Sequence, residues 1–268
     1  MIGGSPWARR LLATTGVFGL VFLGVPILVV IPMSFSSAKA LTFPPPGFSL
    51  RWYQAFFGDP RWMDAMWTST FVALIASVAA LLLGGLAAYG LRRGSFAGRG
   101  WVEANFMAPL IVPTIIVAIA LYLGLAKIGL LGSLAGLVLA HTLLNVPLVM
   151  MVVGVAIREL DPRIEQAAWS LGASWRYTVW KVVLPNLAPS VFAAWIFAFI
   201  GSFDEVIVTS FIAGKYDTVP KKMFNELILE VNPTITAVAT LLIGLTVLAL
   251  AAVTVILARA GKLKQTIV

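Results

Sequence analysis

The chain has 268 residues, of which 60% are hydrophobic and only 11% are charged. Soluble globular proteins are about 45–50% apolar and about 25% charged, so the composition excludes that class and indicates a membrane protein. The sequence holds no cysteine and one histidine, which excludes disulfides, thiol catalysis and thiolate metal sites and argues against a histidine-built metal centre.

Six apolar segments are long enough to cross a bilayer, whose hydrocarbon core of about 30 Å requires roughly 20 apolar residues per helix. We expect spans at residues 11–33, 71–91, 104–126, 134–157, 187–213 and 235–258. Prolines within them, such as Pro113, are expected to be tolerated because neighbouring helices satisfy the freed backbone groups. The predicted fold is therefore all-α, a polytopic membrane protein with six transmembrane helices.

The N-terminal part, residues 1–66, is expected to hold the first span and an outside loop, and residues 67–262 form the predicted core of the transmembrane domain. Arg9, Arg10 and the apolar run after them superficially resemble a signal peptide. The apolar core of a signal peptide has only about 7–15 residues, so we expect this longer run to remain as a span. Aromatic residues between positions 52 and 67 favour the membrane–water interface and predict a short helix on the outer surface.

The basic residues set the expected orientation. Twelve of the nineteen lysines and arginines lie in loops on one side of the membrane, and loops rich in basic residues face the cytoplasm. Both termini are therefore predicted to be cytoplasmic, in a bacterial inner membrane. The net charge of +8 is spread over the loops rather than gathered on one soluble face, so we expect no nucleic-acid partner.

The longest loop on the cytoplasmic side, residues 158–189, is too polar to span the membrane. Asp161 and Pro162 are typical of a helix start, with aspartate at the cap and proline in the first turn. Gly172 adopts positive φ easily and is expected to end this helix. A second short helix, residues 174–183, is expected to stop at Leu184-Pro185, so the loop is predicted to form a compact knob.

This loop contains a motif that resembles the EAA loop of ABC-importer permeases, formed by Glu165, Gln166, Ala167, Ala168, Gly172, Leu184 and Pro185. The small alanine side chains would let the knob enter a groove in another protein closely. The sequence departs from the family pattern at Gln166, which stands where glutamate is usual, while Glu165 lies one residue earlier.

The resemblance covers nearly the whole chain and is most specific in residues 158–245. The segments 202–211, 218–220 and 232–235 are similar to the spermidine/putrescine permease family. This resemblance implies a type I importer of polyamines or related amino compounds. The implied partners are a second permease, a dimer of cytoplasmic ATP-binding subunits, a periplasmic binding protein and membrane lipid. The sequence has no G-x-x-x-x-G-K-[ST] phosphate loop, so ATP hydrolysis is expected on a separate chain, and no cofactor is expected in this one.

Polar residues within the predicted spans are the remaining candidates. A charge at the centre of a membrane helix costs roughly 2.5–3.5 kcal/mol, so Asp204 and Glu205, with the adjoining Phe203, are predicted to form the substrate path or its gate. Asp204 fits the family's position better, and bracing of a helix break or pairing with the partner permease is the alternative. His141 and Asn145 share one helix face and are expected to hydrogen-bond between helices, with a ligand or proton-relay role as the alternative.

Two other protein classes are the alternatives. A secondary transporter driven by an ion gradient would explain the acids within the fifth span but not the knob centred on Gly172. A membrane-embedded enzyme has no support, because the sequence shows no histidine cluster, metal-ligand spacing or nucleophile–base set.

Overall fold

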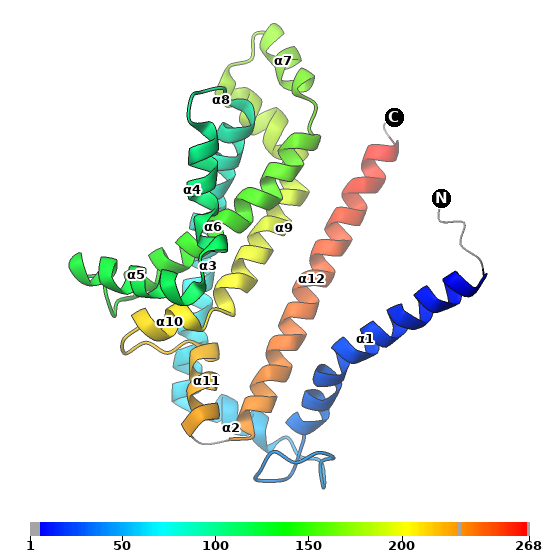
Figure 1. The fold of residues 1–268 in the computed structure, drawn as a ribbon, viewed down its shortest axis with the longest axis vertical. Helices are drawn as coiled ribbons and strands as arrows, with labels where there is room; N and C mark the ends of the chain where they lie inside the picture. The colour runs from blue at the N-terminus through cyan, green and yellow to red at the C-terminus, as the bar shows by residue number, and fades with distance from the viewer. Residues whose placement is uncertain (1–5, 230–231, 267–268) are drawn as a thin grey trace. The chain divides into compact units, whose positions relative to one another are not determined.

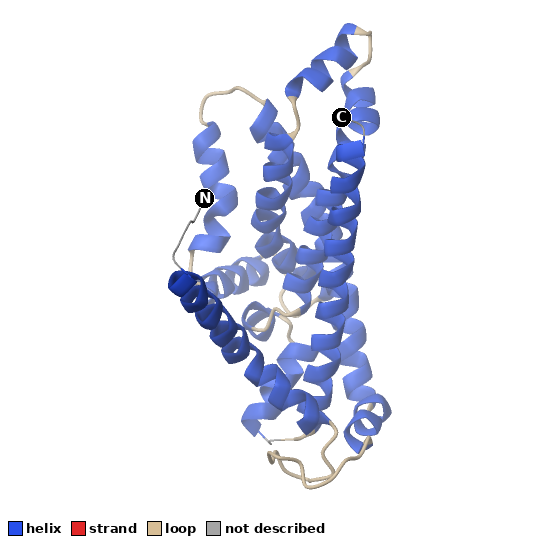
Figure 2. Cartoon of the chain, turned by 90° about the vertical axis from the view of Figure 1, so that its right-hand side faces the viewer, coloured by secondary structure: helices blue, strands red, loops and turns tan. Residues whose placement is uncertain are grey.

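The computed structural model describes residues 6–229 and 232–266. Within them the structure consists of helices and loops, with one isolated β-bridge between Ser36 and Phe48 (Figure 1 and Figure 2), which confirms the all-α prediction. The helices are α1 (Pro6–Ser34), α2 (Arg51–Gly58), α3 (Pro60–Arg93), α4 (Arg99–Ile111), α5 (Thr114–Lys127), α6 (Leu134–Glu159), α7 (Pro162–Ser170), α8 (Trp175–Thr178), α9 (Leu184–Phe203), α10 (Ile207–Ile212), α11 (Val219–Leu229) and α12 (Thr234–Thr266). A π-helical turn, Val179–Val183, joins α8 to α9.

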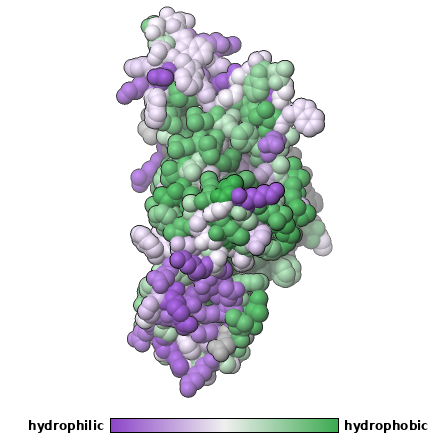
Figure 3. All heavy atoms as spheres, turned by 90° about the vertical axis from the view of Figure 1, so that its left-hand side faces the viewer, coloured by the Kyte–Doolittle hydropathy of each residue, from purple (hydrophilic) through white to green (hydrophobic). Residues whose placement is uncertain are grey.

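In the described part of the chain, five helical segments are long and apolar enough to cross a membrane, and the bent pair of α4 and α5 would provide a sixth. The first, second, fourth and sixth predicted spans lie within α1, α3, α6 and α12. Hydrophobic residues form a broad band across the middle of the face drawn in Figure 3. A soluble protein rarely exposes so wide an apolar surface, whereas a lipid-facing surface requires one.

The third expected span, residues 104–126, is not a single helix. Helix α4 ends at Ile111, α5 begins at Thr114, and the two are bent by 106° (Figure 1). Pro113 has no backbone N–H to donate, and Val112 before it is extended, with φ −75° and ψ 134°. The segment expected as the third span therefore consists of two helices, because the proline ends one helix and the next begins in a new direction.

The fifth expected span, residues 187–213, is displaced toward the N-terminus. A continuous helical segment runs from Trp175 to Phe203, and the short helix α10 follows separately. Leu184-Pro185 does not stop the second helix of the loop, which corrects that expectation. In the π-helical turn the Leu184 N–H bonds to the Val179 carbonyl five residues earlier, and Pro185 then lies in the first turn of α9, where a missing N–H does least harm.

The chain divides into two compact units, one formed by Met1–Pro60 with Glu226–Leu245 and the other by Arg61–Asn225 with Thr246–Val268. In the first unit, the Ser34 hydroxyl at the end of α1 lies 2.8 Å from the Tyr53 hydroxyl in α2. Helix α2 is the short helix expected between the first two spans. The division into residues 1–66 and 67–262 stays a prediction.

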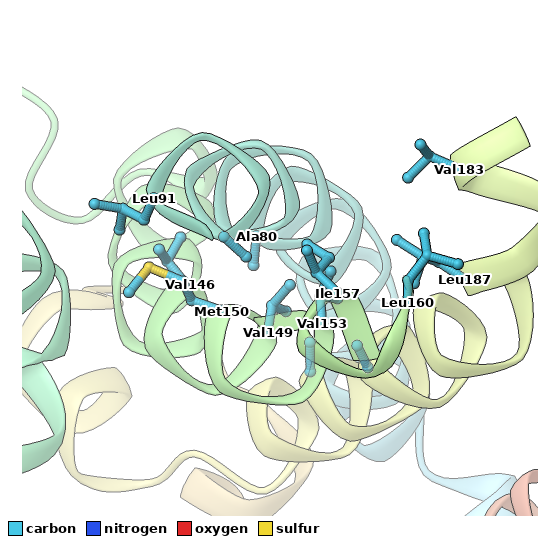
Figure 4. Packing of buried hydrophobic residues seen from close by; sticks show 13 residues of the cluster. Ala80, Leu91, Val146, Val149, Met150, Val153, Ile157, Leu160, Val183 and Leu187 are labelled. Atoms are coloured by element: carbon cyan, nitrogen blue, oxygen red, sulfur yellow. The ribbon is translucent and has the colours of Figure 1, made fainter. Parts of the chain in front are cut away.

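The second unit is organised around α6, which packs between α3 and α9. Val149, Val153 and Ile157 on α6 are buried and belong to the same cluster as Ala80 of α3 and Leu187 of α9 (Figure 4). Small residues on the neighbouring helices let the backbones approach closely, which is the main source of helix association within lipid. This core holds α3, α6 and α9 together. The two candidate sites, the loop after α6 and the acidic residues after α9, lie near the ends of these helices.

Candidate functional site

Helix α7 forms because local groups satisfy both of its ends. The Asp161 carboxylate accepts a backbone N–H of the first turn at 2.9 Å, and Pro162 occupies that turn. At the other end Gly172 has φ 85°, and the Ala173 N–H donates to the Ala168 carbonyl at 3.0 Å. This bond across the glycine is typical of a Schellman ending, so the expected start and end of the helix are confirmed.

The knob exposes only part of the motif. Helices α7 and α8 lie beyond the ends of α6 and α9 (Figure 1). Gln166 and Ala167 are exposed and Ala168 is partly buried, whereas Glu165 is 2% exposed. The motif's acidic residue thus faces the interior of the unit, and its uncharged residues face outward.

Glu165 contacts the end of α3. Its Oε1 accepts a hydrogen bond from Arg93 Nε at 2.8 Å, and its Oε2 accepts one from the Tyr89 hydroxyl at 2.7 Å. The same guanidinium donates to the Leu160 carbonyl at 3.0 Å. Hydrogen bonds to charged groups are the stronger ones, so this carboxylate ties the knob firmly to the second span.

A hollow of about 610 Å³ lies beside α7 and is lined by Ala168, Leu171, Gly172, Ala173, Ser174, Tyr177 and Val182. Leu171 is 90% exposed next to it. The last residues of the motif, Leu184 and Pro185, lie after the π-helical turn, at the start of α9.

The turn after α9, residues 204–206 (the acidic turn), carries both candidate carboxylates. The Asp204 side chain is exposed and has no hydrogen-bond or ion-pair partner within residues 6–229 and 232–266. The Glu205 carboxylate accepts the Val208 N–H at 2.8 Å and so caps α10. The acids therefore lie at a helix break rather than inside a continuous span, and Phe203, only 7% exposed, is packed within the unit.

His141 connects the two helices that flank the acidic turn. Its Nδ1 lies 2.8 Å from the Ser202 hydroxyl of α9, and its Nε2 lies 2.9 Å from the Thr209 hydroxyl of α10. The expected hydrogen bonding between helices is confirmed. Asn145 donates to the His141 carbonyl at 2.8 Å, and among the described residues no group of acids and histidines could hold a metal.

The sequence pattern alone did not identify Tyr89, Arg93 and Thr209 as parts of these sites. A tyrosine and an arginine at the end of a span are typical of a membrane interface, so nothing marks them as partners of a distant glutamate. The position of Glu165, one residue before the usual place, was the available signal. A carboxylate turned inward by the helix requires a donor, and the nearest basic span end provides it.

The fold and these sites define a multi-pass permease of the importer type. Residues 80–261 match the family described as binding-protein-dependent transport system inner membrane component, and the chain belongs to this family. The chain is 34% identical over 248 residues to the putrescine transport system permease protein PotI of Escherichia coli (strain K12), covering 90% of this chain and 86% of that protein. It is 30% identical over 226 residues to the spermidine/putrescine transport system permease protein PotC of the same strain, covering 84% and 85%.

Solved structures share the fold. A chain of a bacterial ABC transporter involved in the import of the acidic polysaccharide alginate matches with a TM-score of 0.67 at 18% identity, over 96% of this chain and 98% of that one. A chain of the MetNI methionine ABC transporter matches with a TM-score of 0.61 at 20% identity, over 74% and 95%. The protein is a permease subunit of a binding-protein-dependent ABC importer, in which ATP hydrolysis belongs to a separate subunit, and a secondary transporter finds no support.

Proposed function

We propose that this subunit carries a small cationic amino compound, of the putrescine and spermidine class, across the inner membrane. Its partners are a second permease subunit, a dimer of cytoplasmic ATP-binding subunits and a periplasmic binding protein. Relatives named for putrescine and spermidine transport, at 34% and 30% identity, support the substrate class. The excess of basic residues in one set of loops supports a cytoplasmic position for both termini and for the knob.

The knob is the contact through which ATP hydrolysis drives transport. The observation that carries this role is α7 itself, a protruding helix with exposed Gln166 and Ala167, closed by Gly172 and tied to α3 through Glu165. A groove in the ATP-binding subunit would accept the small alanine face closely. Closure of the ATPase dimer would then move α7 and, through Glu165, the second span with it. Because Gln166 is uncharged, its contact with the ATPase is a hydrogen bond rather than an ion pair.

The acidic turn borders the substrate path. An amine is a cation at neutral pH, and a carboxylate at the membrane interior lowers the electrostatic barrier to its passage. Asp204 suits this task because its side chain is exposed and without a partner in the described part of the chain. Glu205 shapes the turn by capping α10.

The proposed function is tested by isolating the complex through this chain, reconstituting it with its binding protein, and measuring ATP turnover with putrescine, spermidine and zwitterionic amino acids. Stimulation by the two polyamines is the expected result. Stimulation by zwitterions alone would overturn the substrate class and keep the coupling role. Absence of any co-isolated ATPase would overturn the coupling role of the knob.

Replacing Gly172 with valine should weaken the contact between the knob and the ATP-binding subunit. A β-branched residue at φ 85° is strained by about 1–3 kcal/mol, and the Schellman ending of α7 would be lost. We expect substrate-stimulated ATP turnover and co-isolation of the ATPase both to fall at least about tenfold, since 1.4 kcal/mol corresponds to a factor of ten. Gly172→Asn is the matched control, because asparagine tolerates positive φ, and it should retain most activity. Wild-type coupling in Gly172→Val would contradict the assignment.

A further inference from the structure

The buried polar network around His141 has a definite direction. The Thr209 hydroxyl has one hydrogen, and this hydrogen is directed at the Glu205 carbonyl oxygen, 2.9 Å away, which can only accept. Thr209 Oγ1 must therefore accept from His141 Nε2–H at 2.9 Å. In a neutral imidazole the remaining nitrogen, Nδ1, is an acceptor, and the Ser202 hydroxyl donates to it at 2.8 Å.

This chain of hydrogen bonds ends on the backbone of the acidic turn. It runs from Ser202 in the last turn of α9, through the His141 ring of α6, to Thr209 in α10 and then to the Glu205 carbonyl. The side chain of Glu205 is fixed separately by the Val208 N–H. The peptide that follows Glu205 is thus held from α6, across the break between two helices.

Close packing of α6 against α9 keeps the ring within reach of both hydroxyls. Asn145, one turn after His141, donates to its carbonyl and is itself buried. A Cβ atom built on Gly201 would lie 2.8 Å from the Asn145 Oδ1, so the Asn145 side chain lies directly against the glycine in α9. The His141 side chain is itself buried, with 1% exposed.

We propose that His141 is a positioning residue for the substrate path, which sets the direction of the Asp204 and Glu205 carboxylates through its hydrogen bond to Thr209. The inference rests on the proposed role of the acidic turn in transport. A displacement of about 1 Å at a reacting or binding group can reduce a rate about a hundredfold, so a modest rotation of this turn is enough to impair passage of a cation.

The alternative is that the network only braces the core, and the two roles differ in what they affect. Bracing predicts that any lost buried hydrogen bond lowers thermal stability and transport together. Positioning predicts that losing the Thr209 bond reduces the maximal transport rate far beyond its effect on stability. Ser69 of α3 offers a matched comparison, because it is buried and its hydroxyl accepts the Val219 N–H of α11 at 2.8 Å, a hydrogen bond that does not involve the acidic turn.

The test uses the whole complex in proteoliposomes with its binding protein, measuring putrescine uptake, basal ATP turnover and thermal unfolding. Thr209→Val keeps the branched shape but removes the hydroxyl, and Thr209→Ser restores it. We expect Thr209→Val to lower the maximal uptake rate at least about tenfold at unchanged half-saturating substrate, and Thr209→Ser to recover it within about twofold. Ser69→Ala should lower the unfolding temperature by a similar amount as Thr209→Val, with uptake reduced less than about twofold.

His141→Gln gives a second measurement if Thr209→Val fails to assemble. The glutamine amide nitrogen can donate to Thr209 in place of Nε2–H, so this variant should retain more uptake than His141→Ala. Equal uptake losses in Thr209→Val and Ser69→Ala, or failure of Thr209→Ser to recover the rate, would overturn the positioning role. A wild-type complex that takes up no amine would instead overturn the proposed function.

Discussion

Replacing Arg93 with methionine is expected to uncouple ATP hydrolysis from transport while the complex remains in the membrane. Glu165 is 2% exposed, and without the guanidinium its carboxylate keeps only the Tyr89 hydroxyl as a partner. A buried charge left without its counter-charge costs about 3–5 kcal/mol, which is enough to turn the Glu165 side chain of α7 outward. The ratio of substrate transported to ATP hydrolysed should therefore fall at least about tenfold.

Arg92→Met is the control for this result. Arg92 Nη2 lies 3.0 Å from Glu103 Oε1, with the two side chains 23% and 33% exposed, and a pair so open to solvent contributes only about 0.2–1 kcal/mol. The Arg92→Met substitution removes the same charge from the same end of α3 without affecting the knob. Equal transport ratios in the two variants would contradict the tie between α7 and α3.

A double variant separates stability from coupling. Replacing Glu165 and Arg93 together with methionine leaves no buried charge unpaired, and such exchanges are often neutral for stability. Thermal unfolding of the double variant should return near the wild-type temperature. The transport ratio should stay low, because the hydrogen bonds that fix α7 to α3 are gone.

The ends of α7 could be predicted from the sequence because neighbouring residues determine them. Asp161 and Pro162 start the helix and Gly172 ends it through contacts within a few residues. The inward direction of Glu165 could not be predicted from the sequence, because its partners, Arg93 and Tyr89, lie 72 and 76 residues away. Pairings over such distances depend on how α3 and α7 meet in the fold, which no local pattern encodes.

The two spans whose helices differ from the expected ones, residues 104–126 and 187–213, have different physical causes. Pro113 alone does not predict a helix break, because prolines within membrane helices are often accommodated by neighbouring helices. The end of α9 has no clear sequence signal, since the apolar run resumes at Val206 after only two acids. Hydropathy reports what lies in an apolar environment and not whether the helix is continuous. The helix break explains how the two acids are tolerated, and their role in the substrate path stays a prediction.

Replacing Asp204 with asparagine is expected to reduce uptake of putrescine and spermidine at least about tenfold while assembly stays intact. The amide keeps the size of the side chain and suits the end of a helix, so α9 should still end at Phe203. Only the charge is lost, and two unit charges 4 Å apart interact by about 4 kcal/mol at an effective dielectric constant of 20. Uptake assays with each amine, beside size-exclusion chromatography of the complex, measure the two effects separately.

Glu205→Gln is the matched control, because a glutamine oxygen can still accept the Val208 N–H that caps α10. Its uptake should fall less than that of Asp204→Asn.

A path that acts through charge also predicts that the loss of uptake in Asp204→Asn depends on the charge of the substrate. Spermidine, with more amino groups than putrescine, should lose more uptake, and a zwitterionic amino acid should lose least. Parallel loss of assembly and uptake in Asp204→Asn would assign the residue to bracing, since a carboxylate that holds the helix break or a partner subunit would be missed before any substrate arrives.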